Sequence, residues 1–557
     1  MRLMKWKGFL TGIAALALVA GTVAPSPAAT CGDANNNGGL DAGDGALLLQ
    51  FVAGLNPGTG LCGGAGVLNC LDLNNDGNVD VSDLVILLNL VAGNPTIFQC
   101  TGTGTTLACG SNIQGNVNSN IKLSACTYTV DGTVLVQPNV VISIDPGATI
   151  KGKKASFNAS PSVLVFLRDS KINAPGTAAS PIIFTSDQAP GSRGIGDWGG
   201  VVLNGRAPVN CPGGSCAAEG LTGIQFGGNR PNDSSGIITF ARLEFSGIEL
   251  SPDNELNIFT QNGVGRGTVL NHIQANHGFD DCIEWFGGTV NEKYLVSSSC
   301  GDDMLDWQLG YTGSVQYALA IQNSNNTDTN GRHGFEGDNN ENGFGFSPRS
   351  NPKFCNVTLV GTKTQGGTPG QAGRRGALLR RGTGGKISNV IITDFTESGI
   401  RIDNPETTAQ ACDNTTTLHP DSAGSPSLSV RNTILFDNGP AAPGNVEIQV
   451  AASSNCNAAQ LLGLWNTNNN VQPAGVNDLG PDPLINRAYP VVSNTTNYIP
   501  STPGPADGGV STGCGSLDPA WMDDVHYIGA FQPGNTTPGD AGNWLDQGTG
   551  WISFVTN

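Results

Sequence analysis

The chain has 557 residues, a formal net charge of −18 and only 13% charged residues. An acidic surface of this kind repels nucleic acids and anionic membranes, so neither is expected as a partner, whereas cations are favoured. Glycine accounts for 79 residues, which favours turns and left-handed backbone positions. The composition therefore predicts many short strands joined by turns, in a chain long enough for two or three domains.

The N-terminal residues have the organisation of a secretory signal peptide. A basic segment at 1–7 precedes an apolar run from Phe9 to Val19, and small residues follow up to Ala28. This order predicts a signal peptide over 1–28 and a secreted protein, either extracellular or at the cell surface. No later segment holds about 18 consecutive apolar residues, so no transmembrane segment is expected in the mature chain.

All 14 cysteines lie after the predicted signal peptide. Their even number and the oxidising export route predict disulfides, although the sequence leaves the connectivity open. No Cys-x-x-Cys pair occurs, so neither a zinc ribbon nor a thioredoxin-type site is expected. Near pairs in the sequence are Cys62 with Cys70, Cys109 with Cys126, Cys211 with Cys216, and Cys282 with Cys300.

Two stretches, 33–44 and 72–83, have the ligand spacing of an EF-hand calcium loop. Such a loop places oxygen ligands at positions 1, 3, 5, 7, 9 and 12, with glycine at position 6 for the sharp turn. Gly38 and Gly77 stand at that turn position, and an apolar run of helical character follows each loop. The expected Ca²⁺ ligands are Asp33, Asn35, Asn37, Gly39, Asp41 and Asp44 in the first loop, and Asp72, Asn74, Asp76, Asn78, Asp80 and Asp83 in the second.

The paired loop-helix repeat, with Asp44 and Asp83 at position 12 where an ordinary EF-hand has glutamate, resembles the dockerin family over residues 31–95. We therefore expect a small α-helical calcium-binding domain over 29–98. The resemblance implies a cohesin-like protein as partner. A calcium-stiffened module with a purely structural role is the alternative.

From about Thr105 the sequence changes to short β-rich runs separated by Gly, Asn and Pro-Gly. Within this region Asp280-Asp281-Cys282-Ile283-Glu284-Trp285 recurs 22 residues later as Asp302-Asp303-Met304-Leu305-Asp306-Trp307. A period of this length suits one coil of a solenoid whose strands stack on those of the preceding coil. A β-sandwich array is the alternative fold.

The segment from Gly147 to Asp187 resembles right-handed β-helix proteins of bacterial surfaces, and we extend this resemblance over 120–450 as architecture. The expected fold class is mainly β: a right-handed parallel β-helix over 99–500 behind the small N-terminal α domain. Residues 501–557, which are rich in Trp, Gly and Asp, are expected to form a cap or tail that covers open strand edges.

The same repeat predicts a column of carboxylates. Neighbouring strands lie about 4.8 Å apart, so Glu284 should stack on Asp306, and the two aspartate pairs should stack likewise. Phe335-Glu336-Gly337 aligns with Ile283-Glu284-Trp285, and later coils should place Arg380 and Arg401 in the column of Glu284. The candidate site residues are Asp280, Asp281, Glu284, Asp302, Asp303, Asp306, Arg332 and His333.

Several carboxylates at this spacing repel one another, by roughly 1 kcal/mol per pair in water and by more in a less polar environment. Calcium with oxygen ligands is the simplest compensation. Coupled carboxylates beside His and Arg would also suit acid/base catalysis. Structural turns, in which Asp and Asn satisfy the backbone, are the third interpretation. The Asn-rich loop from Asn323 to Thr329 could hold Arg332 and His333 away from the column.

Three functions follow from these interpretations. The first is a secreted, calcium-binding β-helix protein that binds an extracellular polysaccharide or another extracellular partner. The second is a polysaccharide lyase or glycoside hydrolase acting at the acidic face, because pectate lyases resemble this arrangement in chemical type. The third is a structural exported filament or coat subunit that self-associates.

Overall fold

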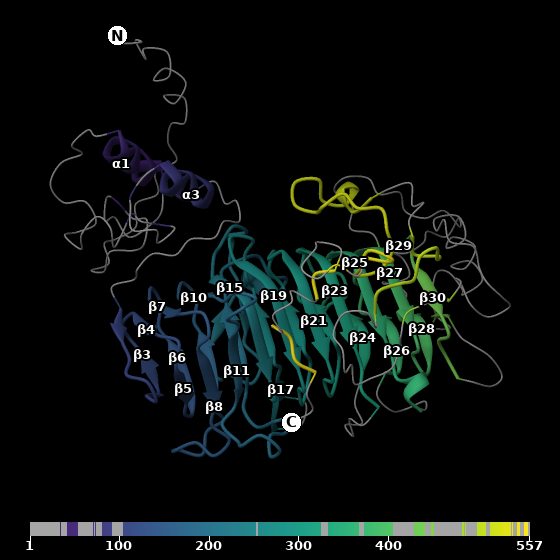
Figure 1. Cartoon of the computed structure of the whole chain (residues 1–557), viewed down its shortest axis with the longest axis horizontal. Coiled ribbons are helices and arrows are strands. Elements are labelled where there is room, and N and C mark those ends of the chain that lie inside the picture. The colour runs from purple at the N-terminus through teal and green to yellow at the C-terminus, as the bar shows by residue number, and fades with distance from the viewer. Residues whose placement is uncertain are drawn as a thin grey trace, which may run out of the picture.

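A computed structural model of the chain shows a solenoid of stacked parallel strands (Figure 1). It describes residues 34, 42–53, 71, 73, 79, 81–91, 104–251, 254–324, 332–366, 373–404, 428–440, 447–450, 482–483, 485, 498–507, 513–535, 537, 543–545 and 551–554. The predicted signal peptide lies outside these residues, as does the pair Cys62 and Cys70.

Two long sheets run along the solenoid, one of 16 strands and one of 11, and every strand pairing within them is parallel. The main path of the 16-stranded sheet is β1 (Thr105–Thr106), β4 (Ile121–Leu123), β7 (Val141–Ile144), β10 (Lys171–Pro175), β15 (Gly236–Glu244), β19 (Val269–Asn276), β21 (Glu292–Ser298), β23 (Ser314–Ile321), β25 (Lys353–Val360), β27 (Gly385–Thr393) and β29 (Leu428–Arg431). Its other strands are β2 (Asn112–Ile113), β5 (Thr127–Val130), β8 (Thr149–Gly152), β11 (Ile182–Ser186) and β30 (Ile434–Phe436).

The 11-stranded sheet forms the second long face of the solenoid. Its strands are β3 (Asn116–Val117), β6 (Thr133–Val136), β9 (Val163–Phe166), β12 (Val201–Asn204), β18 (Phe259–Asn262), β20 (Ile283–Phe286), β22 (Leu305–Gln308), β24 (His333–Gly337), β26 (Arg375–Leu379), β28 (Ser398–Ile402) and β31 (Ile448–Val450). Two short antiparallel hairpins complete the described strands: β13 (Cys216–Ala217) with β14 (Gln225–Phe226), and β16 (Ile248–Ser251) with β17 (Asn254–Leu256).

The predicted mainly β fold, a parallel β-helix, is confirmed. Alternate side chains of each strand point into the coil, so Ile283 and Trp285 of β20 and Leu305 and Trp307 of β22 lie in one continuous apolar core. This alternation follows from the two-residue period of a strand, and it places the residues between them on the outer face.

The coils change shape along the solenoid. In the early coils two short strands form successive segments of the 16-stranded sheet, and β15 then pairs with β10 and β11 at once. Phe240 lies between these two halves of β15 with φ of 46°, a left-handed value that bends the strand. The corresponding residues of later coils, Asn356 and Asn389 among them, share this conformation. The bend is therefore built into each later coil, and asparagine tolerates it well.

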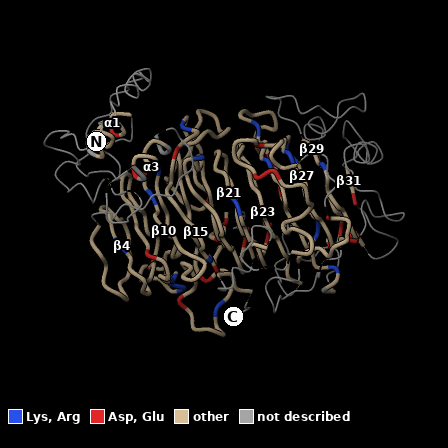
Figure 2. The backbone as a smooth tube through the Cα atoms, turned by 45° about the horizontal axis from the view of Figure 1, so that its top comes forward, with Lys and Arg blue, Asp and Glu red and all other residues tan. Residues whose placement is uncertain are grey.

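In the N-terminal region the described helices are α1 (Ala42–Val52) and α3 (Val81–Val91). Leu48, Leu84 and Leu87 pack with other buried residues in a small core of their own. Both helices are too short to span a bilayer, and no other described helix has the length and apolar character to do so. Figure 2 shows the charged residues as short coloured segments on a mostly uncharged tube.

The described part of the predicted C-terminal cap lies along the solenoid, against the bends of the 16-stranded sheet (Figure 1). The Nδ2 atoms of Asn356 and Asn389 donate to the carbonyl of Tyr527, at 3.0 and 3.1 Å. Trp551 packs edge-on against Phe240. These contacts come from several coils, so the described segment covers a flank of the solenoid and not its end.

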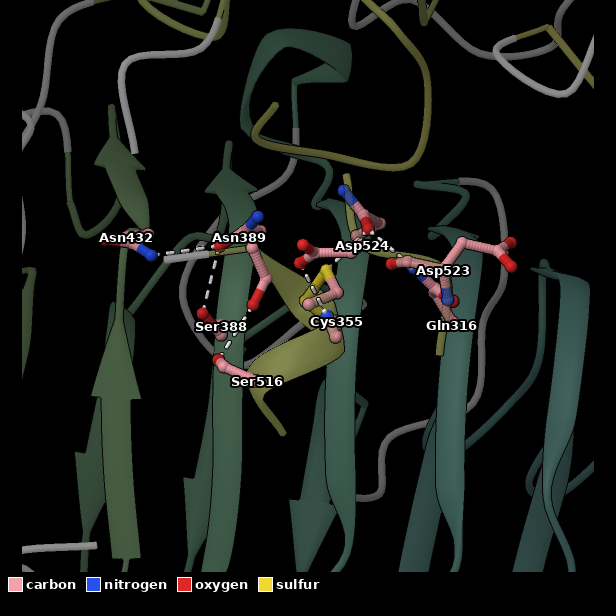
Figure 3. Close-up of a disulfide and its surroundings, with 12 residues drawn as sticks. Gln316, Cys355, Ser388, Asn389, Asn432, Ser516, Asp523 and Asp524 are labelled. Carbon is pink, nitrogen blue, oxygen red and sulfur yellow. Dashed lines mark hydrogen bonds between the residues drawn. A yellow bond between two sulfur atoms is a disulfide. The ribbon is translucent and has the colours of Figure 1, made fainter. Parts of the chain in front are cut away.

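A disulfide between Cys355 of β25 and Cys514 fastens this C-terminal segment (Figure 3). Beside it the Asn432 side chain donates to Asn389 Oδ1 at 3.1 Å. The other described disulfides join three pairs that are close in sequence, namely Cys109–Cys126, Cys211–Cys216 and Cys282–Cys300. No free cysteine occurs among the described residues.

Candidate functional site

The 22-residue repeat stacks in the predicted register. Ile283 pairs with Leu305, Glu284 with Asp306, and Trp285 with Trp307, in the adjacent strands β20 and β22. Asp306 pairs in turn with Glu336 of β24. Three successive coils therefore place the carboxylates of Glu284, Asp306 and Glu336 in one column, which we call the carboxylate column.

The carboxylate column lies on the outer side of the 11-stranded sheet, yet its members are only 4%, 7% and 7% exposed. The chain between β12 and β15 contributes to a second apolar cluster on this sheet, in which Val209 and Phe226 pack with Val202 and Phe286. Glu219 belongs to the same insertion, and its charge raises the pKa of Glu284. The carboxylate column is thus buried, although its side chains point outward from the sheet.

The paired aspartates hold the backbone of the next coil. Asp281 Oδ1 accepts from the backbone N–H of Asp303 at 2.7 Å, and Asp302 Oδ1 accepts from that of Arg332 at 2.8 Å. Asp303 Oδ1 accepts from the backbone N–H of His333 in the same way. This part of the repeat has the structural role considered above, because each carboxylate satisfies a buried donor one coil further on.

Arg332 and His333 lie beside the carboxylates, in the positions that the Phe335-Glu336-Gly337 alignment predicts. Both are 2% exposed, and His333 Nε2 lies 3.9 Å from Glu336 Oε2. The preceding loop therefore does not hold these two residues away from the column. Their backbone bonds to Asp302 and Asp303 fix the two residues at the turn into β24.

The later coils add positive charge, in a register that differs in part from the prediction. Leu378, not Arg380, pairs with Glu336, whereas Arg401 pairs with Leu378 and does stand in the column. The expected position of Arg380 is thus wrong by two residues. A shift of two leaves the same side chains outward, so the apolar pattern could not exclude it.

Arg380 nevertheless reaches the column from its actual position. Its guanidinium forms an ion pair with Glu336 and lies 3.1 Å from Asp338 Oδ1. Arg381 Nη1 lies 2.7 Å from Asp338 Oδ2. These pairs raise the pKa of Arg380, so this arginine stays protonated and cannot act as a base at neutral pH.

Burial dominates the electrostatics of the carboxylates. Desolvation raises the pKa of Glu284 well above its usual range, and the neighbouring Asp306 raises it further. The same cause acts on Asp281, Asp303 and Asp306. The pKa of Glu336 rises to about 7 through burial and the charge of Asp338, although Arg380 opposes the rise. Desolvation lowers the pKa of His333, so its imidazole is neutral.

Three sets of side chains place potential ligand atoms within 4.8 Å of one another: Asp281 with Glu284 and Asp306, Asp280 with Asp281 and Asp302, and Asp303 with His333 and Glu336. The first set is the best match for calcium. It offers carboxylate oxygens only, and Asp306 Oδ1 is buried without a hydrogen-bond partner among the described residues. Glu284 also accepts from Asn257 Nδ2 at 2.5 Å and from Gln308 Nε2 at 2.8 Å, which orients its carboxylate.

Most of the expected EF-hand ligands lie outside the described residues. Asp44 and Asp83 are described, and both are fully buried in the first turns of α1 and α3. Asp83 Oδ1 accepts from the backbone N–H of Leu73 at 2.6 Å, so its carboxylate faces the second predicted loop. Calcium binding by these loops stays a prediction.

The sequence interpretation omitted several residues of this region from the candidate site. Glu336 could have been included, because its alignment with Glu284 was already visible in the sequence. Asp338 and Glu219 carry no such signal, since they reach the column from segments outside the repeated strands.

Residues 115–433, more than half of the chain, match the model of a family described as "Pectate-lyase like beta helix domain". Comparison with curated proteins and with solved structures returned no match. The matched range contains the carboxylate column, the paired aspartates and Arg380. By its fold and by this match, the chain belongs to the family of pectate-lyase-like β-helix domains.

Proposed function

We propose that this chain is an extracellular polysaccharide-binding protein in which Asp281, Glu284 and Asp306 hold a calcium ion that contacts the glycan. One observation carries the proposal: three buried carboxylates converge within 4.8 Å on the outer face of the 11-stranded sheet. Burial of three carboxylates that repel one another is costly, and a divalent cation compensates it. An extracellular location is consistent with the disulfides and with the predicted signal peptide.

The charge of the region explains why a cation would be needed. A cluster of carboxylates by itself repels a polyuronate, whereas a bound Ca²⁺ can bridge protein and sugar carboxylates. Neutral glycans would use the ion through their hydroxyl oxygens, which are hard ligands of the same type.

The test uses the full chain, with and without calcium, on insoluble pectate, alginate and neutral glucans. We expect calcium-dependent retention on at least one glycan and no turnover. Glu284→Gln and Asp306→Asn should each weaken that retention at least about tenfold, because each removes one charged ligand. Glu397→Gln is the control, since Glu397 pairs with Arg374 and Arg375 outside the calcium cluster. Retention that is the same with and without calcium, or that is unchanged in both Glu284→Gln and Asp306→Asn, would refute the proposal.

A catalytic function is the second candidate, favoured by the family match and by the Glu336 carboxyl, whose pKa of about 7 lies near neutrality. In this case the same incubation produces unsaturated products that absorb in the ultraviolet, as a lyase does, or new reducing ends without that absorbance, as a hydrolase does. His333 and Glu336 would be the proton-transfer groups, because Arg380 is held protonated by its ion pairs.

We propose separately that the N-terminal module binds two calcium ions through the loops at 33–44 and 72–83. The burial of Asp44 and Asp83 supports this proposal, because position 12 is where a calcium loop requires an inward-facing carboxylate. Leu49, Val85 and Leu88 leave apolar surface exposed on α1 and α3, which suits a protein partner of the cohesin type. Calorimetry on the full chain should show that Asp72→Ala removes one ion and that Asp306→Asn leaves both loop sites intact.

A further inference from the structure

The second buried cluster, Asp303 with His333 and Glu336, has a different chemistry from the calcium cluster. Asp303 lies just before β22, and the other two residues belong to β24 in the next coil. The three side chains offer ligand atoms within 4.8 Å of one another and are 2%, 2% and 7% exposed. No residue of this cluster belongs to the set of Asp281, Glu284 and Asp306.

The imidazole of His333 is directed at the carboxylates. Its Nε2 lies 3.9 Å from Glu336 Oε2, which is too long for a hydrogen bond. Its Nδ1 is buried and has no hydrogen-bond partner among the described residues. Buried polar atoms in native proteins are nearly always satisfied by a hydrogen bond, a water molecule or an ion, so this side chain points to a missing ligand.

The carboxylates are already oriented by other bonds. One oxygen of Asp303 accepts from the backbone N–H of His333, and one oxygen of Glu336 accepts from Arg380. The two carboxyl groups also share a side-chain hydrogen bond with each other, so a bound metal ion would take the place of the proton between them. Ligands that are held in this way by neighbouring donors are characteristic of metal sites.

We propose that Asp303, His333 and Glu336 bind a transition-metal ion, Zn²⁺ in particular, at a site separate from the calcium cluster. An imidazole nitrogen with two carboxylate oxygens is a donor set that zinc accepts, whereas calcium takes oxygen ligands almost exclusively. The proposal does not depend on the proposed function. Because the ligands come from two successive coils, the ion links them and offsets the repulsion between Asp303 and Glu336.

The experiment titrates the EDTA-treated, dialysed full chain with Co²⁺, as a spectroscopic substitute for Zn²⁺, with calcium present in excess to fill oxygen-only sites. We expect one equivalent of Co²⁺ to give visible absorption bands, and one equivalent of Zn²⁺ to abolish them. His333→Gln should weaken this binding at least about tenfold, and Glu336→Gln should do the same. His526→Gln is the matched control, because His526 is exposed and lies 3.7 Å from Asp524, where it could bind metal adventitiously.

Loss of the bands in His526→Gln, or their persistence in His333→Gln, would overturn the proposal. Circular dichroism of each variant separates loss of the site from loss of the fold, and Asp303→Asn provides a further variant that keeps the backbone hydrogen bond. Glycan retention is measured in parallel. If His333→Gln loses Co²⁺ and keeps calcium-dependent retention, the two sites are distinct; if retention fails while Co²⁺ still binds, only the proposed function is refuted.

Discussion

The indole Nε1 of Trp285 donates a hydrogen bond of 2.6 Å to Glu292 Oε1 inside the solenoid. Glu292 is fully buried, and desolvation raises its pKa to about 7, although the hydrogen bond from Trp285 opposes the rise. Its Oε2 has no hydrogen-bond partner among the described residues. The protonated form of this side chain is therefore the one that the core accommodates.

This relationship predicts a pH-dependent stability. Because the folded-state pKa lies above the unfolded value, the folded protein binds the proton more tightly. The Glu292 contribution to the free energy of unfolding is then fully present below about pH 4.5 and is lost as pH rises through 7, by about 3 kcal/mol. Glu292→Gln should raise the thermal midpoint at pH 8 and change it little at pH 4.5. An equal shift at both pH values would contradict this explanation.

His272 should give the stability of the protein the opposite pH dependence, with a loss towards acidic pH. Its ring stacks between Phe240 and Tyr294, at centroid distances of 4.1 and 4.3 Å, and burial lowers its pKa to about 3. Protonation is therefore disfavoured in the folded state, and stability is lost as pH falls from 6.5 towards 3, by about 3 kcal/mol at pH 4. His272→Phe keeps the stack and should reduce the acid sensitivity of unfolding. His526→Phe, at a side chain that is 49% exposed, is the control and should leave that sensitivity as it is.

Gly337 makes room for the tryptophan of the preceding coil. A Cβ at this position would lie 2.2 Å from Trp307 Cζ2, deep in the core. Gly337→Ala should therefore destabilise the solenoid by about 1–3 kcal/mol, because the indole or the strand must shift. Gly345→Ala is the control, since a Cβ there meets nothing within 4 Å. Chemical unfolding followed by tryptophan fluorescence compares the two, and equal midpoints would count against a close-packed Trp307.

The disulfide Cys355–Cys514 should stabilise the folded protein much more than the disulfide Cys211–Cys216 does. The first closes a loop with a sequence separation of 159 and the second one of 5. In the chain-entropy model, loops of these lengths stabilise the folded state by about 5 and about 2 kcal/mol, respectively. Replacing Cys355 and Cys514 by serine should expose the C-terminal segment to limited proteolysis and hydrogen exchange, whereas the same change at Cys211 and Cys216 should not. Equal protection of residues 513–535 in both double variants would show that packing alone holds the segment.

The sequence by itself determined the coil and its strongest register. The repeat of Asp280 to Trp285 at 302–307 predicted both the solenoid and the pairing of Glu284 with Asp306, which the structure confirms. This was possible because each coil has the same arrangement, with apolar side chains inward and polar side chains outward at a two-residue period. The same period leaves an uncertainty of two residues, and for that reason Arg380 was expected in the position that Leu378 occupies.

Only the tertiary structure decided which distant segments pack on the solenoid. Glu219 approaches from an insertion, and Cys514 bonds to Cys355 across 159 residues. The described C-terminal segment covers a flank of the solenoid and not its end. The periodicity of the sequence indicates whether a side chain points into or out of its own coil. Its desolvation depends on which distant segments pack over it, and no local sequence pattern predicts those contacts.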